Sequence, residues 1–211
     1  MRQFKISKNP YDLGKNTYQT DTFLFNPGVT VLVGCNGSGK TTLIKCIKDE
    51  LKKMDTSDVV YKSFDNYNRG GSQVASNAMF YGDIDTAARA MMSSEGEKIR
   101  LWLCQKAKEI GQFVRASKTA SEIWLFFDAL DSGLSIDNIC EIKENLFKTI
   151  LANNFGKDIY IIVSANNFEF ADAQVCMNVI NGAHFYCNSY GKFKKEVLLT
   201  RKYKDKENID D

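Results

Sequence analysis

Val29-Thr-Val-Leu-Val-Gly34-Cys-Asn-Gly37-Ser-Gly39-Lys40-Thr41-Thr42 is a β-branched run that leads into the pattern G-x-x-x-x-G-K-T. The run predicts a strand, and the apolar residues that follow at helical spacing predict a helix: Leu43, Ile44, Ile47 and Leu51. Glycines allow the loop between them to curl so that its N–H groups point inward, towards an anion at the helix N-terminus. The stretch therefore predicts a strand, a phosphate-binding loop and a helix.

The residues of this loop have separate predicted roles. Lys40 is expected to reach the β- and γ-phosphates of a nucleotide, and the Thr41 hydroxyl is expected to hold the Mg²⁺ that bridges them. The predicted nucleotide-binding residues in this stretch are Gly34, Asn36, Gly37, Ser38, Gly39, Lys40, Thr41 and Thr42.

Composition limits what surrounds the loop. A chain of 211 residues, of which 44% are hydrophobic, can fill one core, so we expect a single α/β domain. The formal net charge of +2 gives no overall basic field of the kind that favours non-specific nucleic-acid binding. The N-terminus has no apolar segment of a secretory signal, and no apolar run is long enough to cross a membrane, so a cytoplasmic location is expected. Six cysteines without a C-x-x-C pair predict buried, reduced thiols: Cys35, Cys46, Cys104, Cys140, Cys176 and Cys187.

The first 28 residues predict a short antiparallel sheet, because Gln3–Ser7 and Thr22–Phe25 alternate and turn signals separate them. Tyr11 and Tyr18 lie where an aromatic ring could stack on adenine. Packing of these rings against the sheet is the competing interpretation.

A second strand is predicted at Val59–Phe64, and a polar, glycine-rich loop at Asp65–Gln73 follows it. Because α/β sheets bind ligands at the carboxyl ends of their strands, Gln73 could bind Mg²⁺ or orient an attacking water. Asp65 competes for that role, and a solvated loop amide is the plain alternative for Gln73.

Ser94-x-x-Glu97 forms a capping box before a helical apolar stripe that extends from Ile99 to Val114. Capping alone explains these two residues. A capped helix N-terminus with Gly96 nearby is also an anion site, which could hold the γ-phosphate of a nucleotide bound elsewhere.

Ile123–Phe127 predicts a buried central strand that ends in Asp128, which would hold Mg²⁺ through water. The plain alternative for Asp128 is a turn residue. Further along the chain the pattern predicts a helix at Ile136–Ile150 and a strand at Asp158–Ser164. It then predicts a hairpin or meander from Cys176 to Cys187, with a turn at Asn181-Gly182, and a further turn at Tyr190-Gly191.

These segments predict a P-loop NTPase fold. It consists of a mostly parallel central sheet with flanking helices, an antiparallel N-terminal sheet and a much reduced helical subdomain between Gln73 and Ser94. We expect one domain over residues 1–203 and a disordered, charged tail over residues 204–211.

Most of the chain resembles the ATP-binding-cassette superfamily of ATPases. Gly34-x-Asn36-Gly37-Ser38-Gly39-Lys40-Thr41 is similar to that superfamily's phosphate loop, and Asp128 matches its metal-binding acid. Ser94-Glu95-Gly96-Glu97 is similar to its signature sequence, and Asp131-Ser132-Gly133-Leu134 to its dimer-interface loop. The resemblance implies a head-to-tail homodimer that encloses two Mg-ATP, with Ser94, Gly96 and Glu97 contacting the nucleotide of the other copy.

The chain departs from that superfamily at two positions. Ala129 follows the metal-binding acid, where a glutamate normally polarises the attacking water, and Ser164-Ala165-Asn166-Asn167 lies where a switch histidine is expected. Loss of a general base typically costs about 10²–10⁴-fold in rate, so slow hydrolysis is expected. Asp131, Glu169 or Asn166 could replace the missing group. The catalytic candidates are Lys40, Asp128, Gln73 and Asp131, and the metal ligands are Thr41, Asp128 and Gln73.

The predicted function is an ATP-driven dimer switch that acts on a partner protein or a nucleic acid. A transporter's nucleotide-binding subunit is the first alternative, although the segment between Gln73 and Ser94 is short for gripping a membrane partner. A small-molecule P-loop kinase is the second alternative, although the arginines of the chain are dispersed. DNA could also be bound through basic residues near the end of the chain, although most basic tails are only solvated. These residues are Lys192, Lys194, Lys195, Arg201, Lys202 and Lys204.

Overall fold

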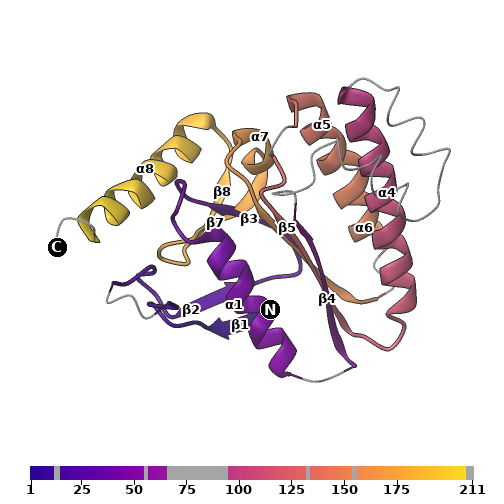
Figure 1. Cartoon of the computed structure of the whole chain (residues 1–211), viewed down its shortest axis with the longest axis horizontal. Coiled ribbons are helices and arrows are strands. Elements are labelled where there is room, and N and C mark those ends of the chain that lie inside the picture. The colour runs from indigo at the N-terminus through magenta and orange to yellow at the C-terminus, as the bar shows by residue number, and fades with distance from the viewer. Residues whose placement is uncertain (12–14, 55–56, 66–94, 132–133, 154–155, 208–211) are drawn as a thin grey trace.

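The computed structural model describes residues 1–11, 15–54, 57–65, 95–131, 134–153 and 156–207, with the backbone alone for residue 65 and residues 95–103. At its centre is a six-stranded sheet in the order β4-β5-β6-β3-β7-β8 (Figure 1). Its strands are β3 (Gly28–Val33), β4 (Val59–Asp65), β5 (Glu122–Asp128), β6 (Asp158–Ser164), β7 (Gln174–Asn178) and β8 (His184–Cys187). Neighbouring strands are parallel from β4 to β7, and β8 is antiparallel to β7.

The central strands are buried on both faces. In β5 the five residues from Ile123 to Phe127 are all buried, and in β6 the six residues from Ile159 to Ser164 are. Side chains alternate between the faces, so Trp124 and Phe126 belong to one apolar cluster while Leu125 and Phe127 belong to the other. A strand that is covered on both faces needs apolar side chains on both, so its sequence is continuously apolar, as in β5 and β6.

One face of the sheet is covered by α1 (Lys40–Lys53) and by the two-stranded antiparallel sheet of β1 (Arg2–Lys5) and β2 (Thr22–Phe25). The rings of Trp124 and Tyr160 stack beneath this layer with their centroids 4.0 Å apart. Arg2 forms an ion pair with Glu122 at 3.1 Å, which ties β1 to the central sheet.

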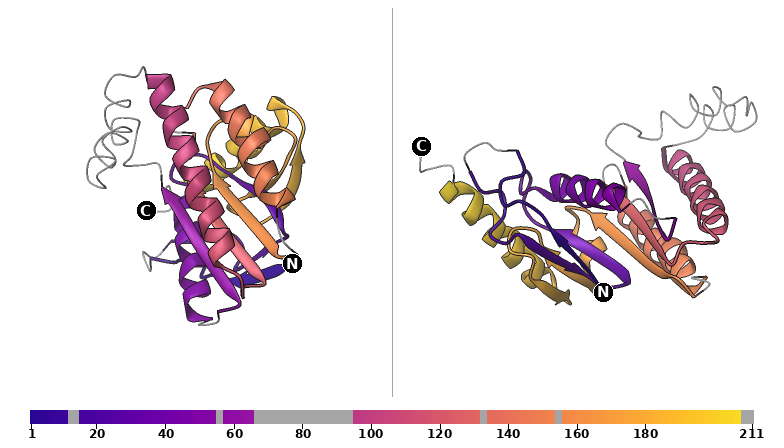
Figure 2. Two further views of the ribbon diagram at one scale, coloured as in Figure 1. Left: turned by 90° about the vertical axis from the view of Figure 1, so that its right-hand side faces the viewer. Right: turned by 90° about the horizontal axis from the view of Figure 1, so that it is seen from below.

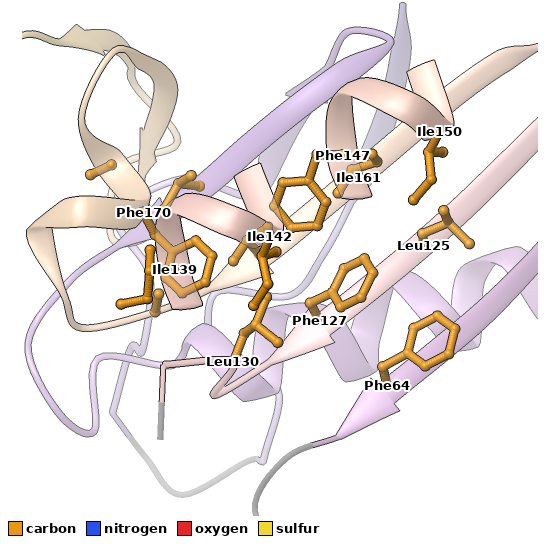
Figure 3. Packing of buried hydrophobic residues seen from close by; sticks show 14 of the residues in the cluster. Phe64, Leu125, Phe127, Leu130, Ile139, Ile142, Phe147, Ile150, Ile161 and Phe170 are labelled. Carbon is orange, nitrogen blue, oxygen red and sulfur yellow. The ribbon is translucent and has the colours of Figure 1, made fainter. Parts of the chain in front are cut away.

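Helices cover the other face of the sheet (Figure 2). They are α4 (Glu95–Ala116), α5 (Ile136–Glu141), η1 (Ile142–Phe147), α6 (Lys148–Ala152) and α7 (Phe168–Ala171). The second to fourth of these form one continuous helical run whose middle part, η1, is a π-helix. Figure 3 shows Ile139, Ile142 and Phe147 of this run packing towards Phe127 of the sheet.

The last described element, α8 (Tyr190–Glu207), corrects the sequence-based prediction for this region. Tyr190 and Gly191 begin a helix instead of forming a turn, and the helix continues through Glu207 into the segment predicted to be disordered. The pattern was misleading because α8 is mostly charged. Tertiary contacts stabilise it, since Phe193 and Thr200 are buried against the body of the protein.

The predicted fold class is confirmed: the central sheet is mostly parallel, helices flank it, and the N-terminal sheet is antiparallel. The reduced helical subdomain predicted between Gln73 and Ser94 lies outside the described residues, and the domain boundary at 203 stays a prediction. Burial was predicted for all six cysteines, whereas Cys104 and Cys140 are exposed on helices. Among the described residues, the structure has no helix with the length and apolar character needed to cross a membrane.

Candidate functional site

The predicted phosphate loop connects the end of β3 at Val33 to the start of α1 at Lys40. The first N–H groups of a helix have no partner inside it, so the N-terminus of α1 offers donors and a favourable dipole to an anion. Gly39, with φ of 93°, adopts a left-handed conformation in which a side chain would be strained. A Cβ at Gly39 would also lie 2.7 Å from the Thr17 methyl group, so only glycine fits there.

Lys40 is buried at the base of the loop. Its ammonium nitrogen donates hydrogen bonds to the carbonyl oxygens of Gly34, at 2.7 Å, and Cys35, at 3.1 Å. Burial lowers the pKa of Lys40, and the neighbouring Cys35, Asp131 and Asp128 oppose that shift. The side chain is therefore held by neutral carbonyls at the position from which it can reach a phosphate.

Thr41 and Asp128 meet at the edge of the sheet. The Thr41 hydroxyl donates to Asp128 Oδ1 over 3.1 Å, although 87 residues separate them in the chain. Asp128 ends β5, which is separated from β3 by β6, and α1 crosses that face of the sheet. A hydroxyl and a carboxylate oxygen are ligands of the hard type that Mg²⁺ prefers, so this pair fits a magnesium ion.

The loop after Asp128 is tied to the turn after β6. Asp131 Oδ2 accepts hydrogen bonds from the N–H groups of Asn166, at 2.6 Å, and Asn167, at 2.7 Å. Ala129, at the position where a glutamate was expected, has a φ of 50°, which few residues other than glycine adopt. Two backbone N–H groups thus occupy one carboxylate oxygen of Asp131, the next acid in the chain.

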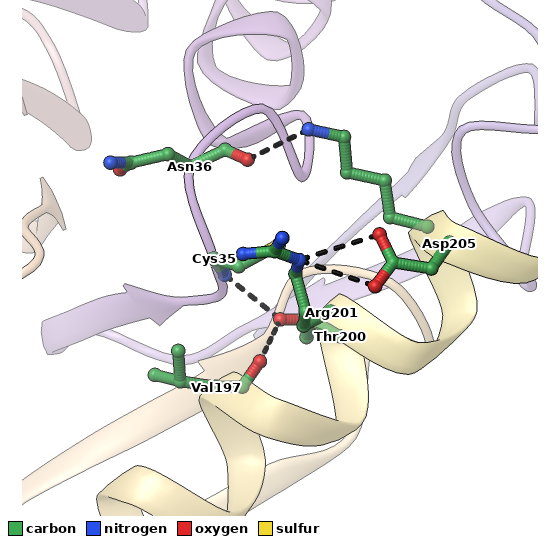
Figure 4. Close-up of polar contacts among 7 residues, drawn as sticks. Cys35, Asn36, Val197, Thr200, Arg201 and Asp205 are labelled. Carbon is green, nitrogen blue, oxygen red and sulfur yellow. Dashed lines mark hydrogen bonds and ion pairs between the residues drawn. The ribbon is translucent and has the colours of Figure 1, made fainter. Parts of the chain in front are cut away.

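Helix α8 supports the phosphate loop from behind (Figure 4). Thr200 Oγ1 accepts the N–H of Cys35 at 2.8 Å and donates to the carbonyl oxygen of Val197 at 2.7 Å. Lys204 Nζ donates to the carbonyl oxygen of Asn36 at 3.1 Å. Sequence analysis missed both contacts, because 165 and 168 residues separate the partners and no motif marks α8.

Tyr18 supports the loop from the side of the N-terminal sheet. Its ring is fully buried and meets Phe23 edge to face at 5.3 Å, and its hydroxyl donates to the Gly39 carbonyl oxygen at 2.8 Å. Burial raises the pKa of Tyr18. The packing interpretation of Tyr18 is therefore correct, and its ring does not reach a nucleotide.

Tyr11 differs from Tyr18, because its side chain is 51% exposed. Its hydroxyl lies 3.1 Å from Thr42 Oγ1, in the first turn of α1. Tyr11 therefore stays the candidate for stacking on adenine.

The structure describes the other predicted site residues to different extents. Gln73 and Ser94 lie outside the described residues, while Gly96 and Glu97 lie in the first turn of α4, where the backbone alone is described. Ser38 is buried, with its hydroxyl against Gly34, where a Cβ would lie 2.4 Å from that oxygen. The described site is thus formed by the loop, by Asp128 and by their supports.

A glycine-rich loop between a parallel strand and a helix, with Lys40, Thr41 and Asp128 together at the sheet edge, is the arrangement expected of a P-loop NTPase. Residues 14–211 match the family described as AAA domain, and the chain belongs to that family of P-loop ATPases. Membership of this family implies nucleotide binding and ATP hydrolysis in general. None of the curated proteins matches the chain.

Among solved structures, one that is similar in part is the crystal structure of a DNA replication initiation factor. It shares 17% sequence identity with this chain at a TM-score of 0.29, over 66% of this chain and 32% of that one. The chain thus spans about a third of that protein's length. A likeness this low does not bear on the function proposed below.

Proposed function

We propose that this protein binds Mg-ATP at the phosphate loop, hydrolyses it slowly, and pairs head to tail with a second copy to switch a partner protein or nucleic acid. The single observation that carries the proposal is the contact between Thr41 Oγ1 and Asp128 Oδ1 at 3.1 Å. This contact brings a hydroxyl and a carboxylate oxygen together next to Lys40 at a helix N-terminus, which supports their proposed role as magnesium ligands. The head-to-tail arrangement follows from the resemblance to ATP-binding-cassette ATPases.

In this proposal, Lys40, Thr41 and Asp128 bind Mg-ATP from positions close to those they have in the structure. A phosphate offers Lys40 a charged acceptor, and charge-assisted hydrogen bonds are stronger than the bonds to neutral carbonyls that now hold its ammonium. Thr41 and Asp128, with Gln73 as a further candidate, would hold the magnesium ion. The ion, when bound, neutralises charge that develops on the phosphates.

The proposal of slow hydrolysis rests on the residues that follow Asp128, where the group that activates the attacking water is expected. Ala129 has no group that could accept a proton, and Asp131 already accepts two backbone hydrogen bonds. We therefore expect Ala129→Glu to raise the rate of phosphate release by about 10²-fold or more. Ala129→Gln is the matched control, because it brings the same bulk and the same backbone strain without the carboxylate.

Equal phosphate release by the two Ala129 variants would contradict this explanation. The rate would then be limited by another step, such as release of product or opening of the dimer.

The dimer is tested by light scattering with and without Mg-ATP, while phosphate release is followed. The solution mass of the wild-type protein should double when Mg-ATP is added. Lys40→Ala should lose both ATP binding and association of the two copies. Ser94→Arg should keep ATP binding and lose association, and Ser93→Arg at the neighbouring position serves as its control. A wild-type chain that binds ATP but stays monomeric would refute the head-to-tail homodimer.

A further inference from the structure

We propose that Lys204 of α8 is a positioning residue that strengthens phosphate binding by polarising the loop from behind. The inference rests on the proposed nucleotide binding and deepens it. Lys204 does not belong to the G-x-x-x-x-G-K-T pattern, and it lies 164 positions after Lys40 in the chain.

The geometry joins α8 to one particular peptide group. Lys204 Nζ donates to the carbonyl oxygen of Asn36 at 3.1 Å, and a Cβ at Gly37 would lie 2.7 Å from that nitrogen. The ammonium therefore sits against the Asn36-Gly37 peptide, in the middle of the phosphate loop. The Asn36 carbonyl oxygen accepts this hydrogen bond, and Figure 4 shows the Asn36 side chain pointing the other way.

A cation at that position acts on the loop in two ways. A charged donor on the carbonyl oxygen of a peptide polarises the peptide, so its N–H, here that of Gly37, becomes a better donor. The positive charge also adds to the potential at the loop, where an anion is expected. Both effects favour a ligand with several negative charges, and neither requires Lys204 to touch it.

The position of Lys204 is fixed by the helix that carries it. One turn earlier, Thr200 is buried and accepts the Cys35 N–H at 2.8 Å, which anchors α8 to the start of the loop. Lys204 itself is half-buried, whereas Lys202 and Lys206 on the same helix are exposed. Lys206, an exposed lysine of the same helix, is therefore a suitable control for Lys204.

The experiment measures the affinity of the full chain for Mg-ATP by calorimetry at low and high ionic strength. Lys204→Met keeps the aliphatic stem and removes the charge, and we expect it to weaken binding about tenfold, the scale of one nearby charge acting on a multiply charged anion at the protein surface. Lys204→Arg should restore most of the affinity, and Lys206→Met should leave it unchanged. The loss in Lys204→Met should shrink at high ionic strength, because the hydrogen bond of the Lys204 ammonium is exposed to solvent and salt screens exposed charges.

Each outcome decides the inference. Wild-type affinity in Lys204→Met, while Lys40→Ala abolishes binding, would overturn the role of Lys204 and leave the proposed function standing. The inference would also be overturned if Lys204→Met and Lys204→Arg lost the same affinity for Mg-ATP and this loss did not depend on salt. The shape of the lysine side chain, and not its charge, would then explain the loss. If the wild-type chain bound no Mg-ATP, the proposed function would fail and the inference with it.

Discussion

The phosphate loop has two supports that differ in chemistry. On the side of the N-terminal sheet, Tyr18 is fully buried, its ring packs on Phe23, and its neutral hydroxyl bonds the carbonyl oxygen of Gly39. On the side of α8, Thr200 bonds the backbone of Cys35, and the half-buried cation of Lys204 bonds that of Asn36.

Because of this difference, we expect the Tyr18 support to affect mainly the stability of the fold and the α8 support to affect mainly the electrostatics of ligand binding. The Tyr18 support consists mainly of buried apolar surface, so its loss should lower the free energy of unfolding whether or not nucleotide is present. The α8 support changes from a buried hydroxyl to a cation near the surface within one helical turn, so its outer part should affect ligand binding more than folding. Four substitutions test this contrast.

Tyr18→Ala should have the largest effect. Removing a buried aromatic side chain typically costs about 3–5 kcal/mol in the free energy of unfolding, because it leaves a cavity. Urea denaturation measures the loss. Tyr11→Ala is the control, since its ring is exposed, and it should cost less than about 1 kcal/mol while weakening ATP binding if it stacks on adenine.

Equal destabilisation by the Tyr18 and Tyr11 alanine variants would contradict the contrast between a buried and an exposed ring.

Thr200→Val should have the next largest effect on stability. The substitution keeps the shape of the side chain but removes the acceptor of the buried Cys35 N–H, which costs about 1–3 kcal/mol. Thr200→Ser, which keeps the hydroxyl, should recover most of this free energy of unfolding. If valine and serine at position 200 were equally stable, the hydrogen bond to Cys35 would not anchor α8.

Tyr18→Phe should cost about 1 kcal/mol at neutral pH, because it removes only the hydrogen bond to Gly39. Burial raises the pKa of Tyr18, so the folded state keeps the phenol proton at a pH where the unfolded state loses it. This contribution to stability is complete below the unfolded pKa of about 10 and is lost as the pH rises above it.

The free energy of unfolding of the wild-type chain should therefore fall more steeply above that pH than that of Tyr18→Phe. Parallel pH profiles would show that the Tyr18 hydroxyl is not buried in solution.

Lys204→Met should have the smallest effect on folding. A half-exposed hydrogen bond from a lysine contributes little, so the free energy of unfolding without nucleotide should change by less than about 0.5 kcal/mol. Thermal unfolding without nucleotide measures this change. Lys206→Met is the control, because it shows how much the loss of an exposed lysine from α8 changes the free energy of unfolding. A loss as large as that of Thr200→Val would make Lys204 part of the structural anchor.

Several parts of the fold could be predicted because their signals are local. The run Ile123–Phe127 is apolar without interruption since both sheet faces are covered, and it predicts a buried strand. The Asn181-Gly182 turn signal between β7 and β8 similarly predicts their antiparallel pairing. The charged sequence of α8 carries no comparable signal, which is why a disordered segment was predicted where the helix continues to Glu207.

The sequence by itself determined where the glycine-rich loop lies and which residues, Lys40, Thr41 and Asp128, are the candidates for binding phosphate and magnesium, because such a loop requires glycines, a cation and oxygen ligands at a fixed spacing. Only the tertiary structure decided that Tyr18 is a core residue and Tyr11 a surface residue, since both precede the loop in similar polar surroundings. It also decided that Thr200 and Lys204 support the loop. Contacts between residues so far apart depend on the packing of α8 against the sheet, which no local pattern records.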